Sequence, residues 1–211
     1  MTTTRGAGRP RAASRALLEE AACELFLEQG YAATSVAEVT MRAGVSRSTF
    51  FNYFDTKSDL LWSAFDEQVV ALAARLAGGD GDDAATSTST AATTPIAAAV
   101  RELRVFAADL GPDSVALAFS QEAAMGLGED LRLAAVRRLA DVRDVVASAL
   151  RAGGASAVAA EVTGATLAGA LLAAVRSWSL RGPGRVALPD VLEEALSALG
   201  PLVRPASPAP R

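Results

Sequence analysis

The segment Val45–Leu60, VSRSTFFNYFDTKSDL, decides the fold of this chain. It places four aromatic residues, one asparagine and the only lysine of the chain within sixteen positions. Most of the remaining sequence consists of alanine, leucine, valine and small polar residues. A stretch this rich in large and hydrogen-bonding side chains indicates a surface used for recognition, and the residues around it indicate which kind.

Two short helices are predicted to begin near this segment, one before it and one within it. Ser35, followed three residues later by Glu38, is the pattern of a capping box, and Gly44 is placed to end that helix. Ser46 is a suitable N-cap for the next short helix. We therefore expect two short helices joined by a turn of about three residues, which is the arrangement of a helix-turn-helix motif.

The second of these helices has an inward and an outward face. At about 100° per residue, Phe50 and Phe54 fall on one side and should pack inward. The outward face comprises Arg47, Ser48, Thr49, Phe51 and Asn52. In a DNA major groove Arg47 can reach guanine O6 and N7, Asn52 can pair with adenine, and Phe51 can lie against a thymine methyl group.

Phosphate contacts are expected beside this face. They would come from Tyr53, from Ser35 with the free amides at its helix N-terminus, and from Lys57 in the first turn of the next helix. Spacing alone fits an ordinary helical hairpin with a solvated polar face equally well.

The stretch from Gly30 to Leu61, GYAATSVAEVTMRAGVSRSTFFNYFDTKSDLL, resembles the DNA-binding signature of the TetR family of bacterial one-component regulators. The turn glycine, the Val-Ser entry, the threonine with its aromatic pair, the aromatic at 54 and the lysine all stand in register. The resemblance implies an all-α homodimer. Each subunit would have a three-helix DNA-binding head and a C-terminal domain that binds a small molecule and dimerises through its last two helices.

The resemblance also implies roles by matched position. The phosphate-contact positions of the family are held by Thr49, Tyr53 and Lys57. The base-reading positions are held by Arg47, Ser48 and Asn52.

Two positions depart from the family pattern. Ser48 stands where glycine is common, and Phe51 stands where tyrosine is common, so an expected hydrogen bond to DNA becomes an apolar contact. The form RSTFFNYF followed by LLWSAFDEQV is similar to the branch that includes the mycofactocin-system regulators, some of which respond to acyl-CoA.

Charge supports local rather than general contact with nucleic acid. The formal net charge is −4 and the pI is near 5.0, which argues against binding through bulk positive charge. The N-terminus is nevertheless basic, because Arg5, Arg9, Arg11 and Arg15 all precede the first acidic residue, Glu19. Such an arm is a solvated tail in most proteins, but beside a DNA-reading element it can contact a groove or phosphates.

The amino-acid composition excludes most kinds of enzyme active site. The chain has no histidine, which excludes imidazole general acid/base catalysis, histidine-based nucleophile arrangements and imidazole zinc sites. We therefore expect no enzyme, cofactor or metal; carboxylate-based catalysis is the least favoured option. With one cysteine, Cys23, and no visible signal peptide, a cytoplasmic protein is expected. The longest uncharged run, Val162–Val175, is too short to cross a bilayer and is interpreted as a buried helix, so no membrane partner is expected.

Helical spacing recurs along the chain and strand patterns are nearly absent, so an all-α fold is expected. Beyond the helix-turn-helix, helices are predicted near residues 14–29, 56–76, 95–109, 113–125, 129–151, 156–180 and 189–203. The predicted parts are a basic flexible arm (1–13), a helix-turn-helix domain (14–57), a helical ligand-binding and dimerisation domain (58–204) with a mobile loop (78–94), and a disordered tail (205–211).

The predicted helix 156–180 carries small residues at i+4 spacing, which lets helices approach closely. The two possible stripes are Gly164, Ala168 and Leu172, or Ala165, Gly169 and Ala173. With the helix 189–203 they could form a dimeric four-helix bundle. Burial wholly within one subunit is the alternative.

A ligand pocket is expected among aromatic residues that the dimer does not need. The candidates are Trp62, Phe65, Phe106, Phe119 and Trp178, with Met125 as an adaptable neighbour and Gln121, Glu122, Arg104 and Arg176 as nearby polar groups. Aromatic residues at helical spacing are more often plain core than ligand wall.

These observations favour a dimeric repressor that leaves a palindromic DNA operator when a small hydrophobic effector binds the body. An acyl-CoA-like molecule is one candidate effector. The helix 56–76 should carry the change, since it bears Lys57 at the DNA end and Trp62 and Phe65 near the body. The alternative is a small-molecule binding module whose head has lost specific DNA binding, a reading that Phe51 and the acidic charge keep open.

Overall fold

The structure is a computed structural model that describes residues 11–78 and 94–203. All regular secondary structure in these two ranges is helical, which confirms the predicted all-α fold. The helices are α1 (Arg11–Gln29), α2 (Val36–Ala43), α3 (Arg47–Phe51), α4 (Asp59–Gly78), α5 (Pro95–Asp109), α6 (Ser114–Ser120), α7 (Glu122–Met125), α8 (Gly128–Ala152), α9 (Ala157–Arg181) and α10 (Leu188–Val203).

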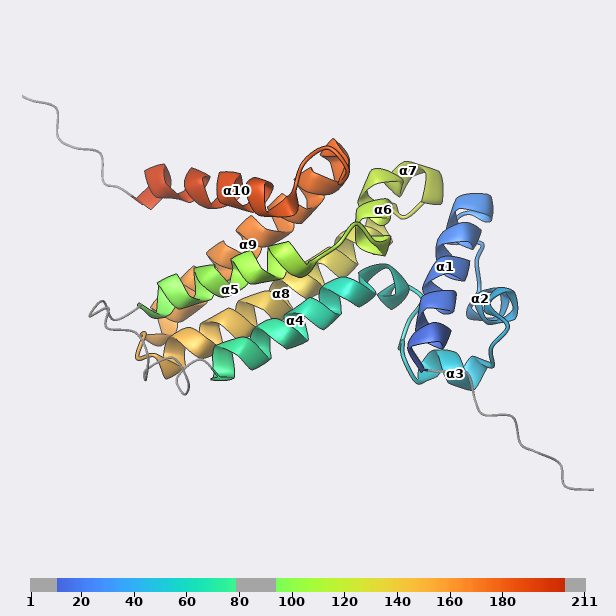
Figure 1. The fold of residues 1–211 in the computed structure, drawn as a ribbon, viewed down its shortest axis with the longest axis horizontal. Coiled ribbons are helices and arrows are strands. Elements are labelled where there is room, and N and C mark those ends of the chain that lie inside the picture. The colour runs from blue at the N-terminus through green and yellow to red at the C-terminus, as the bar shows by residue number, and fades with distance from the viewer. Residues whose placement is uncertain (1–10, 79–93, 204–211) are drawn as a thin grey trace, which may run out of the picture.

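The helices form a small head and a larger body (Figure 1). α1, α2 and α3 pack together at one end of the molecule. α4 leads out of the head and runs through the body, where it lies beside α5 and α8. α9 packs on α8 and α10, while α6 and α7 lie at the end of the body nearest the head. α4 is therefore the element that both parts share.

The helix-turn-helix forms because its caps are satisfied locally. The Ser35 hydroxyl accepts a hydrogen bond from the Glu38 N–H, and the Glu38 carboxylate accepts one from the Ser35 N–H at 2.8 Å. Gly44 ends α2 in the left-handed conformation at φ 65°, which a side chain would disfavour. Ser46 then caps α3 by accepting from the Thr49 N–H at 3.0 Å. The predicted motif is confirmed.

The inward face of α3 anchors the head. Phe50 and Phe54 are almost completely buried, as their spacing predicted, and their ring centroids lie 5.6 Å apart. Phe26 from α1 is fully buried and meets Tyr31 edge-on at 5.0 Å. Burying one such ring contributes about 1.5–3 kcal/mol, so these side chains hold the three short helices together.

Several predicted boundaries need correction. α1 begins at Arg11, so the last residues of the predicted arm are helical, since alanine and arginine favour a helix. α4 begins at Asp59 rather than just after Thr56, because the backbone before it forms tight turns, in which the Asp59 N–H donates to the Thr56 carbonyl at 3.2 Å and the Leu61 N–H to the Ser58 carbonyl at 3.1 Å. The predicted helix 113–125 is divided at Gln121, whose backbone is not helical (φ −114°, ψ 19°). Residues 1–10, with Arg5 and Arg9, most of the predicted loop (79–93) and the predicted tail lie outside the described residues.

One of the two small-residue stripes on α9 packs within the chain. Gly164 is buried against α8 so closely that a Cβ atom there would lie 2.8 Å from the Arg143 carbonyl oxygen and 3.1 Å from the Ala147 Cβ. Ala168 and Leu172 are buried on the same face. This stripe therefore serves the α8–α9 contact of one subunit.

The other stripe faces outward. Ala165 and Ala173 are exposed, and a Cβ atom on Gly169 would meet nothing within 4 Å. α9 is also the one helix in residues 11–78 and 94–203 that is long and apolar enough to cross a membrane, and half of its most apolar window is buried inside the molecule. One face of α9 therefore packs against α8, and the opposite face is open at the surface.

A buried carboxyl group lies where α1 of the head meets the start of α6. Asp113 caps α6 by accepting from the Val115 N–H at 3.0 Å, while its Oδ2 has no hydrogen-bond partner in the described part of the chain. Burial, with a smaller contribution from the charge of Glu19, raises the pKa of Asp113 to about 6. Burial also raises the pKa of the neighbouring Cys23 thiol to about 11. This contact is therefore short of positive charge.

Replacing Asp113 by asparagine should make the stability less dependent on pH. Between about pH 4 and 6 the folded state holds a proton that the unfolded state has lost, so the wild-type protein loses stability as the pH rises through this window. Asparagine keeps the capping oxygen and cannot ionise. We expect Asp113→Asn to gain about 1–3 kcal/mol at pH 7.5 and little at pH 4, which is about 2–4 °C in Tm per kcal/mol.

Thermal unfolding followed by circular dichroism between pH 4 and 8 measures this difference. Asp109→Asn is the matched control, because Asp109 is exposed at the end of α5. A gap between wild type and Asp113→Asn that stays constant over this range would contradict the assignment.

Candidate nucleic-acid interface

The predicted outward face of α3 lies at the surface of the head. Arg47, Ser48 and Asn52 are exposed, Phe51 exposes 48% of its area, and Thr49 is half-buried. Asn52 is the C-cap of α3, so its side chain stands at the end of the helix. The structure thus brings the five residues together on one face, and their contact with bases stays a prediction.

The hydroxyl groups at the start of α3 are already oriented by one another. The Ser46 Oγ lies 2.8 Å from the Ser48 Oγ and 2.7 Å from the Thr49 Oγ1. A hydroxyl group can donate one hydrogen bond and accept two, so the Ser48 and Thr49 hydroxyls retain capacity for a further partner, whereas Ser46, which also accepts from the Thr49 N–H, does not. Ser48, which replaces the common glycine, is thereby part of this hydroxyl cluster.

Phe51 supports a neighbouring cation. Its ring meets Phe50 edge-on with centroids 5.1 Å apart, which fixes the ring against the core of the head. The Arg47 guanidinium lies over the other part of the ring, 5.5 Å from its centroid. An exposed contact of this kind contributes about 0.5–1 kcal/mol. A ring without a hydroxyl group can therefore still position Arg47.

Lys57 is engaged inside the head. Its Nζ donates to the Tyr31 carbonyl at 2.5 Å and to the Thr34 carbonyl at 3.0 Å, and it lies 4.0 Å from the centre of the Tyr31 ring. Burial lowers the pKa of Lys57. An ammonium group has three donors, so two are used to tie the loop before α2 to the turn before α4.

Ser35 lies next to that loop and is paired with a carboxylate. Glu38 accepts from the Ser35 N–H at 2.8 Å and from its hydroxyl at 2.7 Å, and these bonds lower the pKa of Glu38. A phosphate would have to compete with this negative group for the same donors. Tyr53, the remaining predicted phosphate contact, is half-buried beside Phe54.

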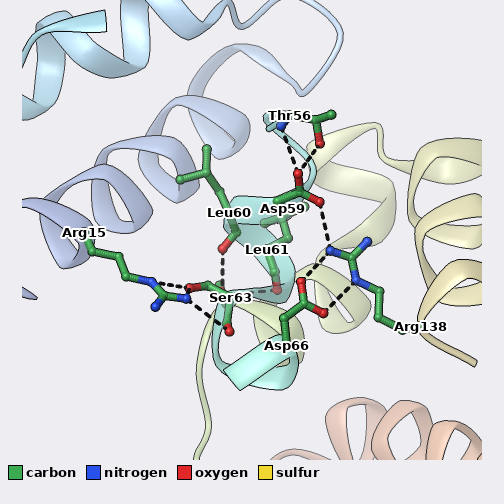
Figure 2. A network of polar contacts seen from close by, with 9 residues as sticks. Arg15, Thr56, Asp59, Leu60, Leu61, Ser63, Asp66 and Arg138 are labelled. Carbon is green, nitrogen blue, oxygen red and sulfur yellow. Dashed lines mark hydrogen bonds and ion pairs between the residues drawn. The ribbon is translucent and has the colours of Figure 1, made fainter. Parts of the chain in front are cut away.

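Arg15 does not belong to a free basic arm. Its Nε donates to the Ser63 hydroxyl at 2.8 Å and to Glu19 at 3.2 Å, and its Nη1 pairs with Glu67 (Figure 2 shows the contact with Ser63). This side chain therefore joins α1 to α4. Arg15 lies just beyond the predicted arm (1–13), and Ser63 and Glu67 already bind its guanidinium, so contact of the arm with DNA stays a prediction for the residues before it.

Tyr31 was missed by sequence reasoning. Its N–H donates to the Met125 carbonyl at the end of α7 at 2.7 Å, while its own carbonyl accepts from Lys57. The loop before α2 is thus attached to the body as well as to α4. An aromatic residue directly after a helix-ending glycine, Gly30, was the available signal.

Four of the predicted effector residues form a packed cluster. Trp62 meets Phe65 at 5.4 Å and Phe119 at 5.7 Å between ring centroids, and Phe65 meets Phe106 at 5.0 Å. All four are buried. The rings contact one another directly, so the structure shows them as core.

The other predicted effector residues lie elsewhere. The Trp178 indole donates to the Val186 carbonyl between α9 and α10 at 3.2 Å, Met125 is fully buried, and Gln121 is exposed. Arg104 is held by Glu193. Phe119 and Arg176 line a surface groove of about 450 Å³ together with Ala135, Leu172, Ala173, Ser177 and Leu180.

A helix-turn-helix head with an exposed polar face, joined by one long helix to an all-helical body, is an arrangement suited to a DNA-binding regulator. Within the described residues no group of three or more acidic, cysteine or histidine side chains could hold a metal ion. Residues 18–64 match the sequence model of the family described as bacterial regulatory proteins, tetR family.

Two solved structures share the fold over nearly the whole chain. The first is FadR of Thermus thermophilus, a TetR-family transcriptional repressor in complex with lauroyl-CoA; it is 25% identical, has a TM-score of 0.51, and the match covers 93% of this chain and 99% of that one. The second is a putative TetR-family regulator from Syntrophomonas wolfei, 15% identical with a TM-score of 0.53, covering 95% and 100%.

No curated protein matches the sequence. The family match in the head and the shared fold support a DNA-binding transcriptional regulator, and residues 18–64 carry the likeness to the tetR family. The narrower resemblance to mycofactocin-system regulators is not supported.

Replacing Lys57 by methionine should destabilise the head without DNA present. The change leaves the carbonyl groups of Tyr31 and Thr34, both buried residues, without a charged donor, at a cost of about 1–3 kcal/mol. Arg47→Met is the matched control, since it also removes one positive charge but loses only an exposed contact with the Phe51 ring. Thermal unfolding should show a Tm several degrees lower for Lys57→Met and nearly unchanged for Arg47→Met. Equal Tm values for the two variants would contradict a structural role of Lys57.

Proposed function

We propose that this protein is a dimeric transcriptional repressor that binds a palindromic operator and leaves it when a small molecule binds the body. The observation that carries the proposal is the division of α3 into two faces. Phe50 on α3 and Phe54, which follows the end of α3, are buried, while Arg47 at its start and Asn52 at its C-cap stand exposed. A fixed helix with outward hydrogen-bonding groups is what the major groove accepts.

Base reading would fall to Arg47, Ser48 and Asn52. Arg47 is carried over the Phe51 ring, which limits the directions in which its guanidinium can reach. Thr49, Tyr53, Lys57 and Ser35 would contact phosphates, and such contacts set the register of the helix on DNA. Lys57 and Ser35 already have partners inside the head, so their positions would be fixed before DNA binds. They would then form part of a preorganised edge that contacts the DNA phosphates.

The outward face of α9 supports dimerisation. Ala165, Gly169 and Ala173 offer a small-residue stripe with open space above it, and Val158 and Val162 are exposed apolar side chains on the same helix. Small residues at i+4 spacing allow a second helix to approach closely. A symmetric dimer would present two α3 helices to successive major grooves, about 34–36 Å apart.

The effector is proposed to be a small hydrophobic molecule, for example an acyl-CoA-like compound. The protein itself is proposed to act in the bacterial cytoplasm. FadR of Thermus thermophilus, which shares the fold, binds lauroyl-CoA in its solved structure. In this chain the Trp62 cluster is closed, so an effector entering it would have to separate helices α4, α5 and α6. The groove beside Phe119 and Arg176 offers an apolar wall with a positive group. A ligand that favours the opened body shifts the equilibrium by its differential affinity.

Selection of bound sequences from random double-stranded DNA tests the DNA-binding function. The full-length protein should enrich a palindrome. Asn52→Ala should then lose preference at one base of each half-site, at about 1–3 kcal/mol, while the exposed α1 variant Glu20→Ala keeps it. Enrichment of no palindrome would favour the alternative, a binding module whose head no longer reads DNA.

Titration of lauroyl-CoA into the protein–operator complex tests the effector class. Fluorescence anisotropy of the labelled operator should fall as the ligand is added, because release follows from preferential binding to the DNA-free conformation. Free coenzyme A serves as the control without an acyl chain. Anisotropy that responds equally to both compounds, or to neither, would rule out an acyl-CoA effector and leave the DNA-binding function standing.

A further inference from the structure

A buried arginine fastens α8 of the body to the first turns of α4. Arg138 is only 3% exposed. Its Nε and Nη2 donate to the two carboxylate oxygens of Asp66 at 3.0 and 2.7 Å, and its Nη2 also donates to Asp59 at 2.9 Å (Figure 2). The guanidinium lies 5.2 Å from the Trp62 ring centroid. Bidentate contacts of this kind fix direction as well as distance.

The same contacts continue into the head. The second oxygen of Asp59 accepts from the N–H of Thr56 at 2.9 Å and from its hydroxyl at 2.8 Å. The next residue, Lys57, holds the carbonyl groups before α2. A continuous path of hydrogen bonds and one peptide link therefore joins Arg138 on α8 to the loop that starts the helix-turn-helix.

The head grips the same part of α4 from its own side. Arg15 of α1 donates to the hydroxyl and to the carbonyl oxygen of Ser63, and it pairs with Glu67 (Figure 2 shows the contacts with Ser63). Ser63 lies between Asp59 and Asp66 in the sequence. The first two turns of α4 are thus held by one arginine from the body and one from the head.

An open pocket lies between the head and α8 beside this network. It has a volume of about 360 Å³, and its walls include Tyr53, Phe54 and Asp55 from the head and Arg137, Arg138 and Asp141 from α8. Head and α8 are therefore not packed tightly against each other at this point. Elsewhere one continuous apolar core joins the head to the body, and at this point the charged contacts add a directional constraint to it.

Energetics also argue for an orienting role. Burial of a guanidinium and carboxylates costs several kcal/mol, and well-packed apolar residues of similar volume are often equally stabilising. Burial acts to raise the pKa of both carboxyl groups; bonds from Arg138 and Thr56 outweigh it at Asp59, whose pKa is lowered, but not at Asp66, whose pKa is raised. Since Arg138 is buried while the Asp66 side chain is 41% exposed, the pair is of limited benefit to stability and is better explained by the geometry that it imposes.

We propose that Arg138 is the positioning residue through which the body sets the orientation of the head, so that a displacement of α8 changes the affinity for DNA. α8 also packs along α9, whose other face is the proposed dimer surface. Arg138 would thereby fix each head relative to the dimer and set the spacing of the two α3 helices. This inference rests on the proposed DNA-binding function and identifies how that function is controlled.

Two variants of the network test the inference. Arg138→Met with Asp66→Asn removes the pair and leaves only Asp59, which still accepts from Thr56, as a carboxylate beside the new apolar side chain. Arg138→Lys keeps the charge but not the bidentate geometry. The matched control is Arg132→Met, also on α8, where the arginine is exposed and pairs with Glu129 of its own helix. All are compared as full-length protein at a temperature where circular dichroism shows each to be folded.

Affinity for the selected operator should fall about tenfold in the double variant and less in Arg138→Lys, with no change in the control. Amide hydrogen exchange should rise in Tyr31–Ser35 and Thr56–Asp66 while α9 keeps its protection. Operator binding as tight as, or tighter than, that of wild type would overturn the inference. So would a loss of affinity in which exchange rises equally in α9, because that describes general destabilisation. A wild-type protein that selects no operator would instead refute the proposed function.

Discussion

The structure depends on the ion pairs that hold the start of α4. This helix belongs to the head and to the body at once, and its first two turns carry Asp59, Ser63 and Asp66, each bound by an arginine from another helix. Apolar packing fixes what lies within each part: Phe50 and Phe54 in the head, and the Trp62 cluster in the body. Between the parts, directional charge contacts supplement the continuous apolar core and orient the first turns of α4.

The elements that could be predicted are those fixed by short-range chemistry. The capping box of Ser35 and Glu38, the left-handed Gly44 and the N-cap Ser46 are each completed within a few residues, so the sequence contains all the information needed. The predicted helix 95–109 matches α5 because Thr94 caps it and Pro95 opens it. The inward face of α3 followed from helical periodicity, and the outward residues followed with it.

The contacts that could not be predicted join residues far apart in the chain. Arg138 lies on the same face of α8 as Leu131, Ala134 and Val142, which are all buried, so its burial could be predicted from helical spacing. Its partners on α4 were not, since nothing local selects Asp59 or Asp66 over other carboxylates. Arg15 and Lys57 looked free for the same reason: one binds a side chain and the other binds carbonyl groups in another element. The sequence suggested a ligand pocket among five aromatic residues of the body, but only the fold shows that four of them close on one another and that Trp178 lies elsewhere.

The close approach at Gly164 has a consequence for how the two subunits would communicate. With a backbone carbonyl of α8 only 2.8 Å from the position of a missing Cβ, α8 and α9 cannot slide past each other without collision, and they should move as one rigid body. In the proposed dimer the α8–α9 pair would pack, through the outward face of α9, against the same pair of the partner subunit. Occupation of one effector site would then alter the affinity of the second, and binding curves would depart from a simple hyperbola by a free energy that each site exerts equally on the other.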